Sequence, residues 1–252
     1  MCTVTYIPIA TAQKSHSLET AEVLNFIFTS NRDESTSREA AILPSQVEIS
    51  GKKVLIPIDP VGQGSWIALQ ENGTTVCLLN GGFEAHVPNP PYKHSRGLVV
   101  LHYFKFRNTV EFVDQYDFEH LEPFTLIVAG HNQLTELKWD GKKMHCTNLD
   151  VKLPHIWSSA TLYAPDIILN RKKHFERWLL ENAYLLASNP NLIFDFHQFK
   201  GTANVEENIE INRGNKLRTV SITSIQNTSK LNLMQYRDLI NNQSKTIEFG
   251  IY

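Results

Sequence analysis

The 252-residue sequence predicts an α+β fold, because strand-like segments occur in blocks instead of alternating regularly with helices. Runs of β-branched and aromatic residues fill the first third of the chain, recur after Pro123, and return near the C-terminus. Helical patterns lie between these blocks, and the clearest one begins at Pro165. The βαβ order that is typical of a parallel sheet is not found.

The first third of the chain predicts strands separated by short glycine-containing turns. Gly51 and Gly73 suit hairpin turns, since glycine tolerates a positive φ. A proline-rich stretch at residues 87–92 predicts an extended surface loop, because proline fits neither a regular helix nor a central strand. The expected strands cover residues 2–9, 22–29, 47–49, 54–58, 65–70 and 74–79.

Helices and strands alternate in blocks over the rest of the chain. Ser95 is a candidate cap for a helix that ends near residue 106. Further helices are expected at residues 109–116, 165–187 and 192–199, where apolar residues recur at helical spacing. Strands are expected at residues 124–129, 134–139, 143–147, 218–225, 231–234 and 246–251.

Composition indicates one globular domain that spans residues 1–252. Hydrophobic residues make up 42% of the chain and charged residues 20%, enough to bury a core. The 24 basic and 26 acidic residues nearly cancel, which argues against a nucleic-acid partner. No apolar run is long enough to span a membrane, the N-terminus lacks a signal-peptide pattern, and the three cysteines form no disulfide framework. We therefore expect a cytoplasmic protein.

Cys2, directly after the initiator methionine, is the first candidate for chemistry. Removal of Met1 would expose a residue that carries both a thiol nucleophile and an α-amine whose ordinary pKa of about 8 lets it act as a base. A buried or frayed terminal cysteine without a catalytic role is the structural alternative.

A second candidate is the polar run from Asn31 to Glu34, which follows an apolar strand. Arg32 can grip a carboxylate or phosphate with two parallel hydrogen bonds, and Asp33 can orient an ammonium group or a thiol. The alternative is a solvated charged turn. We expect the strand to end at this run and to place its polar groups beside Cys2.

These motifs, in their order along the chain, resemble the NRDE family, which includes the transport and Golgi organisation proteins. The resemblance rests on Met1-Cys2, Asn31-Arg32-Asp33-Glu34, Gly64-Ser65-Trp66, Leu79-Asn80, Ser95-Arg96-Gly97 and Arg218-Thr219-Val220-Ser221. It implies a four-layer αββα sandwich like that of N-terminal-nucleophile (Ntn) hydrolases of the cysteine type.

The resemblance also implies roles for individual residues. Cys2 matches the nucleophile, Arg32 and Asp33 the charged pair near it, and Asn80 the amide of an oxyanion hole; Arg218 matches a late arginine of the site. We assign Asn31 and Trp66 to substrate binding. Where the family commonly has a second asparagine, this chain has Ser159, which cannot supply an amide donor. A strand-end turn is the alternative role for Asn80.

Two functions are compatible with this resemblance. The first is an Ntn-type cysteine amidohydrolase that acts on a small-molecule amide. The second is a carrier that binds haem or an acyl-coenzyme A or lipid ligand on the same fold. A purely structural protein is a third reading.

The sequence predicts no metal site. Histidines recur every eight residues at His86, His94 and His102, and this spacing does not return to one helix face. We assign no cofactor.

Overall fold

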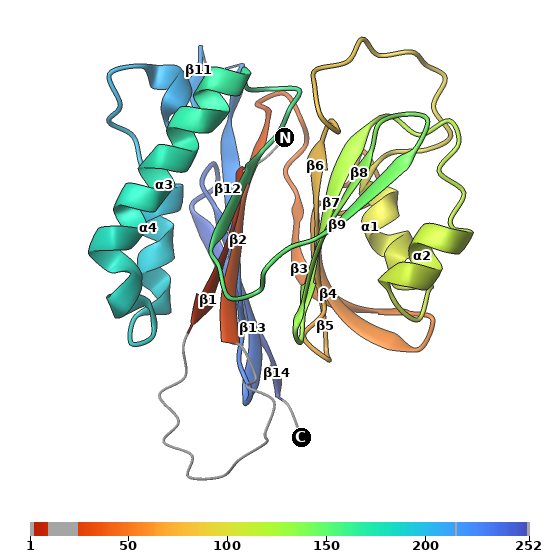
Figure 1. Cartoon of the computed structure of the whole chain (residues 1–252), viewed down its shortest axis with the longest axis horizontal. Coiled ribbons are helices and arrows are strands. Elements are labelled where there is room, and N and C mark those ends of the chain that lie inside the picture. The colour runs from red at the N-terminus through yellow and green to blue at the C-terminus, as the bar shows by residue number, and fades with distance from the viewer. Residues whose placement is uncertain (1–2, 10–24, 215, 251–252) are drawn as a thin grey trace.

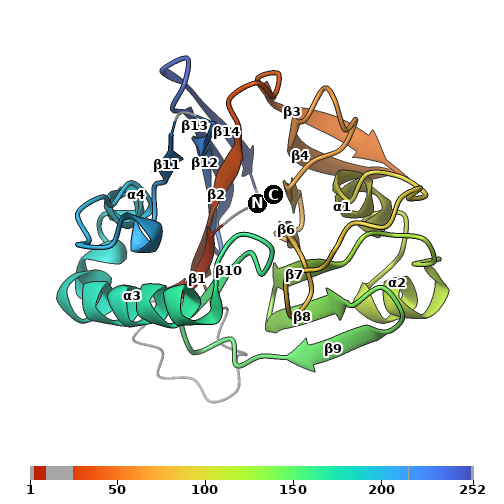
Figure 2. The same cartoon turned by 90° about the horizontal axis from the view of Figure 1, so that it is seen from above.

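Two β-sheets pack face to face, and helices cover both outer faces (Figure 1). The computed structural model describes residues 3–9, 25–214 and 216–250. Seen from above, the order of layers is helix, sheet, sheet, helix (Figure 2). The predicted α+β class and the αββα sandwich are confirmed.

The first sheet contains both ends of the described chain. Within the described residues it has seven strands in the order β10-β1-β2-β12-β13-β14, with β11 paired to β12. All of these pairings are antiparallel. The strands are β1 (Thr3–Ile9), β2 (Asn25–Ser35), β10 (His155–Ser158), β11 (Asn212–Arg213), β12 (Leu217–Asn227), β13 (Leu231–Asp238) and β14 (Gln243–Gly250).

The second sheet is an antiparallel meander in which each strand pairs with the next along the chain. Tight turns make this order possible, as at Gly73 and Gly141, both of which have a positive φ. Its strands are β3 (Ile42–Ile49), β4 (Lys52–Ile58), β5 (Ile67–Gln70), β6 (Thr75–Asn80), β7 (Phe124–Gly130), β8 (Gln133–Trp139) and β9 (Met144–Asn148).

Apolar residues fill three layers between these elements. Residues such as Phe28, Leu69 and Ile225 form the core between the sheets. The helices α3 (Pro165–Leu186) and α4 (Ile193–His197) close a second core over the first sheet, and α1 (Gly97–Tyr103) and α2 (Thr109–Gln115) close a third over the second sheet. Two short 3-10 helices, η1 (Pro190–Leu192) and η2 (Val205–Glu207), complete the helical layer of the first sheet.

Three sequence expectations need correction. The strand expected to end at the polar run continues through Asn31–Glu34 to Ser35, because β12 pairs with it along this whole length. The strand β10 was not expected, since its four residues carry too short a pattern. The third concerns the start of α1: the capping position is Arg96, whose side chain makes no capping hydrogen bond, and the predicted cap Ser95, one residue earlier, accepts a hydrogen bond of 3.3 Å from the Gly97 amide.

Candidate functional site

A cavity of about 540 Å³ lies between elements of both sheets and the loop before α1. Its walls include two buried side chains, Arg32 from β2 and Trp66 from the segment before β5. Asn80 at the end of β6, Arg96 and Glu122 also line it. We call this cavity the cleft.

Arg32 is the most buried charge in the cleft. Its side chain is 5% exposed and its guanidinium carbon lies 4.6 Å from the centre of the Trp66 ring, a cation–π contact. Arg32 Nη2 lies 3.3 Å from Asp59 Oδ2, and Arg38 Nη2 donates a hydrogen bond of 2.7 Å to the same oxygen. Burial opposes the charge on Asp59, but the Arg38 hydrogen bond, the Gly62 amide and both guanidinium charges hold its pKa below the ordinary value.

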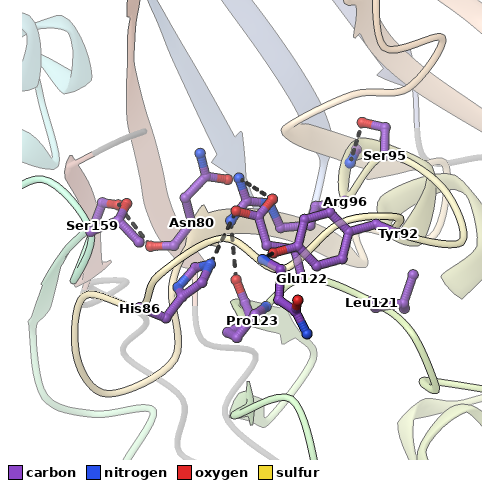
Figure 3. A network of polar contacts seen from close by, with 12 residues as sticks. Asn80, His86, Tyr92, Ser95, Arg96, Leu121, Glu122, Pro123 and Ser159 are labelled. Carbon is purple, nitrogen blue, oxygen red and sulfur yellow. Dashed lines mark hydrogen bonds and ion pairs between the residues drawn. The ribbon is translucent and has the colours of Figure 1, made fainter.

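Asn80 ends β6 at the cleft and is held through its backbone. The Ser159 hydroxyl donates a hydrogen bond of 2.7 Å to the Asn80 carbonyl oxygen (Figure 3). Ser159 is buried, and Thr161 lies 3.1 Å from its hydroxyl. Ser159, which stands where the family commonly has a second asparagine, therefore contacts the backbone of Asn80. The Asn80 side chain faces the cleft.

One wall of the cleft is a charged network on the loop before α1 (Figure 3). Glu122 accepts a hydrogen bond from His86 at 3.0 Å and pairs with Arg96 at 3.0 Å. Arg96 also donates to the Pro123 carbonyl at 3.1 Å. These contacts tie the proline-rich loop to the segment before β7, so the wall is braced by polar contacts.

Asp33 lies outside the cleft, in a buried network on the helix side of the first sheet. Its carboxylate accepts hydrogen bonds from Thr219 at 2.6 Å and Tyr163 at 2.9 Å. Arg171 of α3 stacks 3.6 Å from the centre of the Tyr163 ring and donates a 2.6 Å hydrogen bond to Thr3. We call these five residues the Asp33 network.

The charge state of the Asp33 network follows from its burial. Burial raises the pKa of the Asp33 carboxyl, whereas the hydrogen bonds from Thr219 and Tyr163 and the positive charge of Arg171 oppose this rise. Burial and the adjacent Asp33 charge raise the pKa of Tyr163 far above its ordinary value, so Tyr163 remains a hydrogen-bond donor. Asp33 can therefore hold a proton more readily than a surface carboxylate.

The turn after β10 links the cleft to the Asp33 network. Ser159 contacts the Asn80 backbone, and Tyr163, four residues later, contacts Asp33. The amide of Tyr163 donates to the Ser159 carbonyl, which closes this turn. On the strand before it, Ser158 pairs with Thr3. The two groups of polar residues thus converge on Thr3, where β1 begins.

Two of the predicted site residues lie elsewhere. Side chains alternate along a strand, so Asn31 projects to the helix side, opposite to Arg32. Its amide donates to the carbonyls of His197 and Ile209, so these contacts join β2 to the segments around α4, and Asn31 does not line the cleft. Arg218 lines a smaller cavity of about 130 Å³ next to the cleft, which Arg32 and Glu34 also border. Cys2, the predicted nucleophile, lies outside the described residues.

Comparison with known proteins places the chain in a family. The profile of the family Transport and Golgi organisation 2 matches residues 7–237. The chain belongs to this family. A comparison with curated protein sequences finds no match. The family match contains Arg32, Asp33, Asn80 and Arg218 and begins after Cys2.

Solved structures of hydrolases share the fold of this family member. A variant of conjugated bile acid hydrolase from Clostridium perfringens has a TM-score of 0.52 and 12% identity, and the match covers 97% of this chain and 92% of that one. The Caenorhabditis elegans ortholog of N-acylethanolamine-hydrolyzing acid amidase has a TM-score of 0.54 and 13% identity, with 88% and 92% covered. The predicted Ntn-hydrolase-like fold is therefore confirmed.

Neither a metal centre nor a membrane-spanning helix is found among the described residues of the chain. Among them, no group of three or more histidine, cysteine or acidic side chains could hold a metal ion. No helix in the described ranges is long and apolar enough to cross a membrane.

Sequence reasoning missed the partners of Asp33 and Asn80. Arg171 carried a signal, since it stands four residues from both Ile167 and Phe175 on the buried stripe of α3. A charge at such a position needs a buried partner. Tyr163 and Thr219 gave no comparable signal, because their contacts join segments far apart in the sequence.

Proposed function

We propose that the protein is an Ntn-type cysteine amidohydrolase that cleaves a small-molecule amide, with Cys2 as nucleophile after removal of Met1. The observation that carries this proposal is the position of Thr3, the residue that follows Cys2 in the chain. Thr3 belongs to the Asp33 network and pairs with Ser158, the neighbour of the Ser159 that contacts Asn80. The hydrolase neighbours on the same fold support it further.

In the proposed reaction the Cys2 sulfur attacks the amide carbonyl carbon, and the α-amine of Cys2 accepts the thiol proton. The Asn80 amide donates a hydrogen bond to the oxyanion as it forms. Collapse of the intermediate breaks the C–N bond, and the leaving amine takes the proton from the α-ammonium. Water then attacks the thioester, which releases the carboxylic acid and restores the thiol.

Asp33 and Arg32 have separate roles in this proposal, because strand alternation places them on opposite faces of β2. Asp33 orients the terminal amine from the helix side, where Tyr163 and Thr219 fix its carboxylate. Arg32 contacts the substrate, since it lines the cleft and Asp33 does not. Arg218 borders the adjacent cavity and has no step in this reaction.

The test compares variants of two cysteines against a panel of acyl amides. Cys2→Ala is expected to abolish hydrolysis, and Cys2→Ser to retain a small fraction of it, because a hydroxyl is a weaker nucleophile than a thiol. Cys146→Ala is the matched control, since Cys146 is exposed on β9 in the second sheet. It should hydrolyse the panel like the wild type.

The alternative function, a carrier on the same fold, predicts a different outcome. A Cys2→Ala protein that binds haem or an acyl-coenzyme A as the wild type does, while no protein in the series hydrolyses an amide, would support the carrier and contradict the amidohydrolase.

A further inference from the structure

Two buried side chains of the cleft, Arg32 and Trp66, each have a donor atom without a hydrogen-bond acceptor among the described residues. Arg32 Nη2 has no hydrogen-bond partner, although Asp59 lies near it, and the indole nitrogen of Trp66 has none either. Arg32 is 4% exposed and Trp66 is 7% exposed. A buried donor without an acceptor is destabilising, so two neighbouring ones indicate a place where a ligand supplies the acceptor.

The two donors belong to one spot, because the Arg32 guanidinium lies over the Trp66 ring at 4.6 Å. A third unpartnered group, the hydroxyl of Thr223, lies deeper on the same face of the first sheet. Thr223 pairs with Tyr236 across β13, and the Tyr236 ring is 6.5 Å from Trp66. All three groups can donate a hydrogen bond, and neither Arg32 nor Trp66 can accept one.

The charges around this spot limit what it can bind. Three arginines and three acids line the cleft, so its formal charge is balanced. Arg96 pairs with Glu122, both Arg38 and Arg32 lie beside Asp59, at 2.7 and 3.3 Å, and Glu34 accepts a hydrogen bond from the Ser35 amide. The net charge of the cleft therefore does not decide which chemical group of a ligand binds here. The hydrogen-bond donors of Arg32 and Trp66 that lack acceptors decide it. A guanidinium with free donors binds a carboxylate best, through two parallel hydrogen bonds.

We propose that the substrate is an amide that carries a separate carboxylate, and that Arg32 and Trp66 bind this carboxylate while Asn80 faces the amide carbonyl. Asn80 and Arg32 line one cleft, so a single small molecule can reach both. This inference rests on the cleft of the proposed amidohydrolase being its ligand site. It does not depend on turnover, since the carboxylate contact is made in the ground state.

The experiment measures binding in the Cys2→Ala protein, where hydrolysis cannot interfere. The probes are adipamic acid, which has an amide at one end and a carboxylate at the other, and adipamide, its diamide analogue. We expect adipamic acid to bind at least about tenfold more tightly, as lost charge-assisted contacts typically cost this much. It should also shift the Trp66 indole NH resonance, assigned by its loss in Trp66→Phe.

Two arginine variants separate the contact from a general charge effect. Arg32→Gln should reduce the preference for adipamic acid to about twofold or less. Arg237→Gln is the matched control: Arg237 adjoins Tyr236 on β13, but its guanidinium stacks 3.5 Å over Phe194 on the helix side. It should keep the full preference. Circular dichroism and thermal unfolding would verify that each variant is folded, and Arg32→Met, which also removes the charge, replaces Arg32→Gln if the latter is not.

Equal binding of the two probes, or a preference that survives in a folded Arg32 variant, would overturn the proposal, as would an unshifted Trp66 resonance. Buried water alone would then accept the hydrogen bonds of Arg32 and Trp66. Failure of the amidohydrolase proposal looks different, since a protein without turnover can still show the carboxylate preference.

Discussion

Among single residues, Asn80 is the clearest candidate to stabilise an oxyanion. Its backbone is fixed by Ser159, so its side chain is presented to the cleft by a strand end and not by a mobile loop. Preorganised donors of this kind act mainly on the transition state, because they contribute no reorganisation cost as charge develops.

Asn80→Ala is therefore expected to lower kcat by about 10²–10³-fold with a much smaller change in KM. Ser159→Ala removes only the hydrogen bond behind Asn80 and should lower kcat by about tenfold or less. Steady-state kinetics on a cleaved amide would check both. If KM rises while kcat stays unchanged in Asn80→Ala, the residue binds substrate and stabilises no oxyanion.

Arg171 is a buried charge whose removal leaves Asp33 without its positive neighbour. Arg171→Met removes the hydrogen bond to Thr3, the contact with the Tyr163 ring and the positive charge that opposes the raised pKa of Asp33, so it should lower the free energy of unfolding by about 1–3 kcal/mol. Arg177→Met, on the exposed face of the same helix, should change it little. Urea unfolding measures the difference, and a double variant that also carries Asp33→Asn should recover part of the loss. A loss no larger than that of Arg177→Met would contradict a stabilising role of Arg171 in the Asp33 network.

At the scale of elements, the start of β5 packs directly against the start of α1. A Cβ on Gly64 would lie 2.3 Å from the Gly97 carbonyl carbon, a backbone atom that cannot move without shifting α1. Both glycines line the cleft, so their close approach also sets its shape. The glycine before Ser65-Trp66 is thus required for packing.

Gly64→Ala should consequently destabilise the protein by about 1–3 kcal/mol or more and weaken ligand binding in the cleft. Gly130→Ala is the control, since the nearest atom to its Cβ lies 3.8 Å away and its φ is ordinary. Thermal unfolding would compare them. Similar melting temperatures for the two variants would show that α1 and β5 can separate without cost.

Sequence patterns predicted most elements, because hairpin turns and apolar runs are local signals. The long helix α3 and the meander of the second sheet follow from such signals at Pro165 and Gly141. The continuation of β2 through Asn31–Glu34 was not predictable, because the strand that pairs with it, β12, and the partners of Asp33 lie more than 100 residues away.

The same limit applies to the site. The motif residues Arg32, Asp33 and Asn80 could be named from the sequence, but their grouping could not. A strand conformation places Arg32 and Asp33 on opposite faces, whereas the expected strand end would have left them together. The sequence also could not predict that Arg218 lines a neighbouring cavity and not the cleft, since this depends on the register between β2 and β12.

At the scale of the whole molecule, His197 joins the outer helical layer to two strands of the first sheet. It lies on α4, within 2.8 Å of the Thr5 hydroxyl on β1 and 2.5 Å of the Asn31 side-chain oxygen on β2. Burial lowers the pKa of His197 to about 3, so it is neutral at pH 7. Burial also lowers the pKa of His102, to about 4.

Stability should therefore fall in acid. Between about pH 6.5 and 3 the unfolded chain binds the proton and the folded His197 does not, so the free energy of unfolding decreases as pH falls. Its slope from this group approaches about 1.4 kcal/mol per pH unit. His197→Gln should flatten the curve relative to the wild type, whereas His131→Gln, in an exposed turn, should not. Urea unfolding at several pH values checks this, and parallel curves for wild type and His197→Gln would contradict it.

Cys2, at the N-terminus after removal of Met1, is the proposed nucleophile of the cleft. The most direct measurement is the intact mass of the purified protein before and after incubation with the p-nitrophenyl ester of hexanoic acid. The proposal predicts a mass that lacks Met1, and an added hexanoyl group that Cys2→Ala does not acquire. A protein that keeps Met1, or a hexanoyl group that Cys2→Ala also acquires, would contradict it.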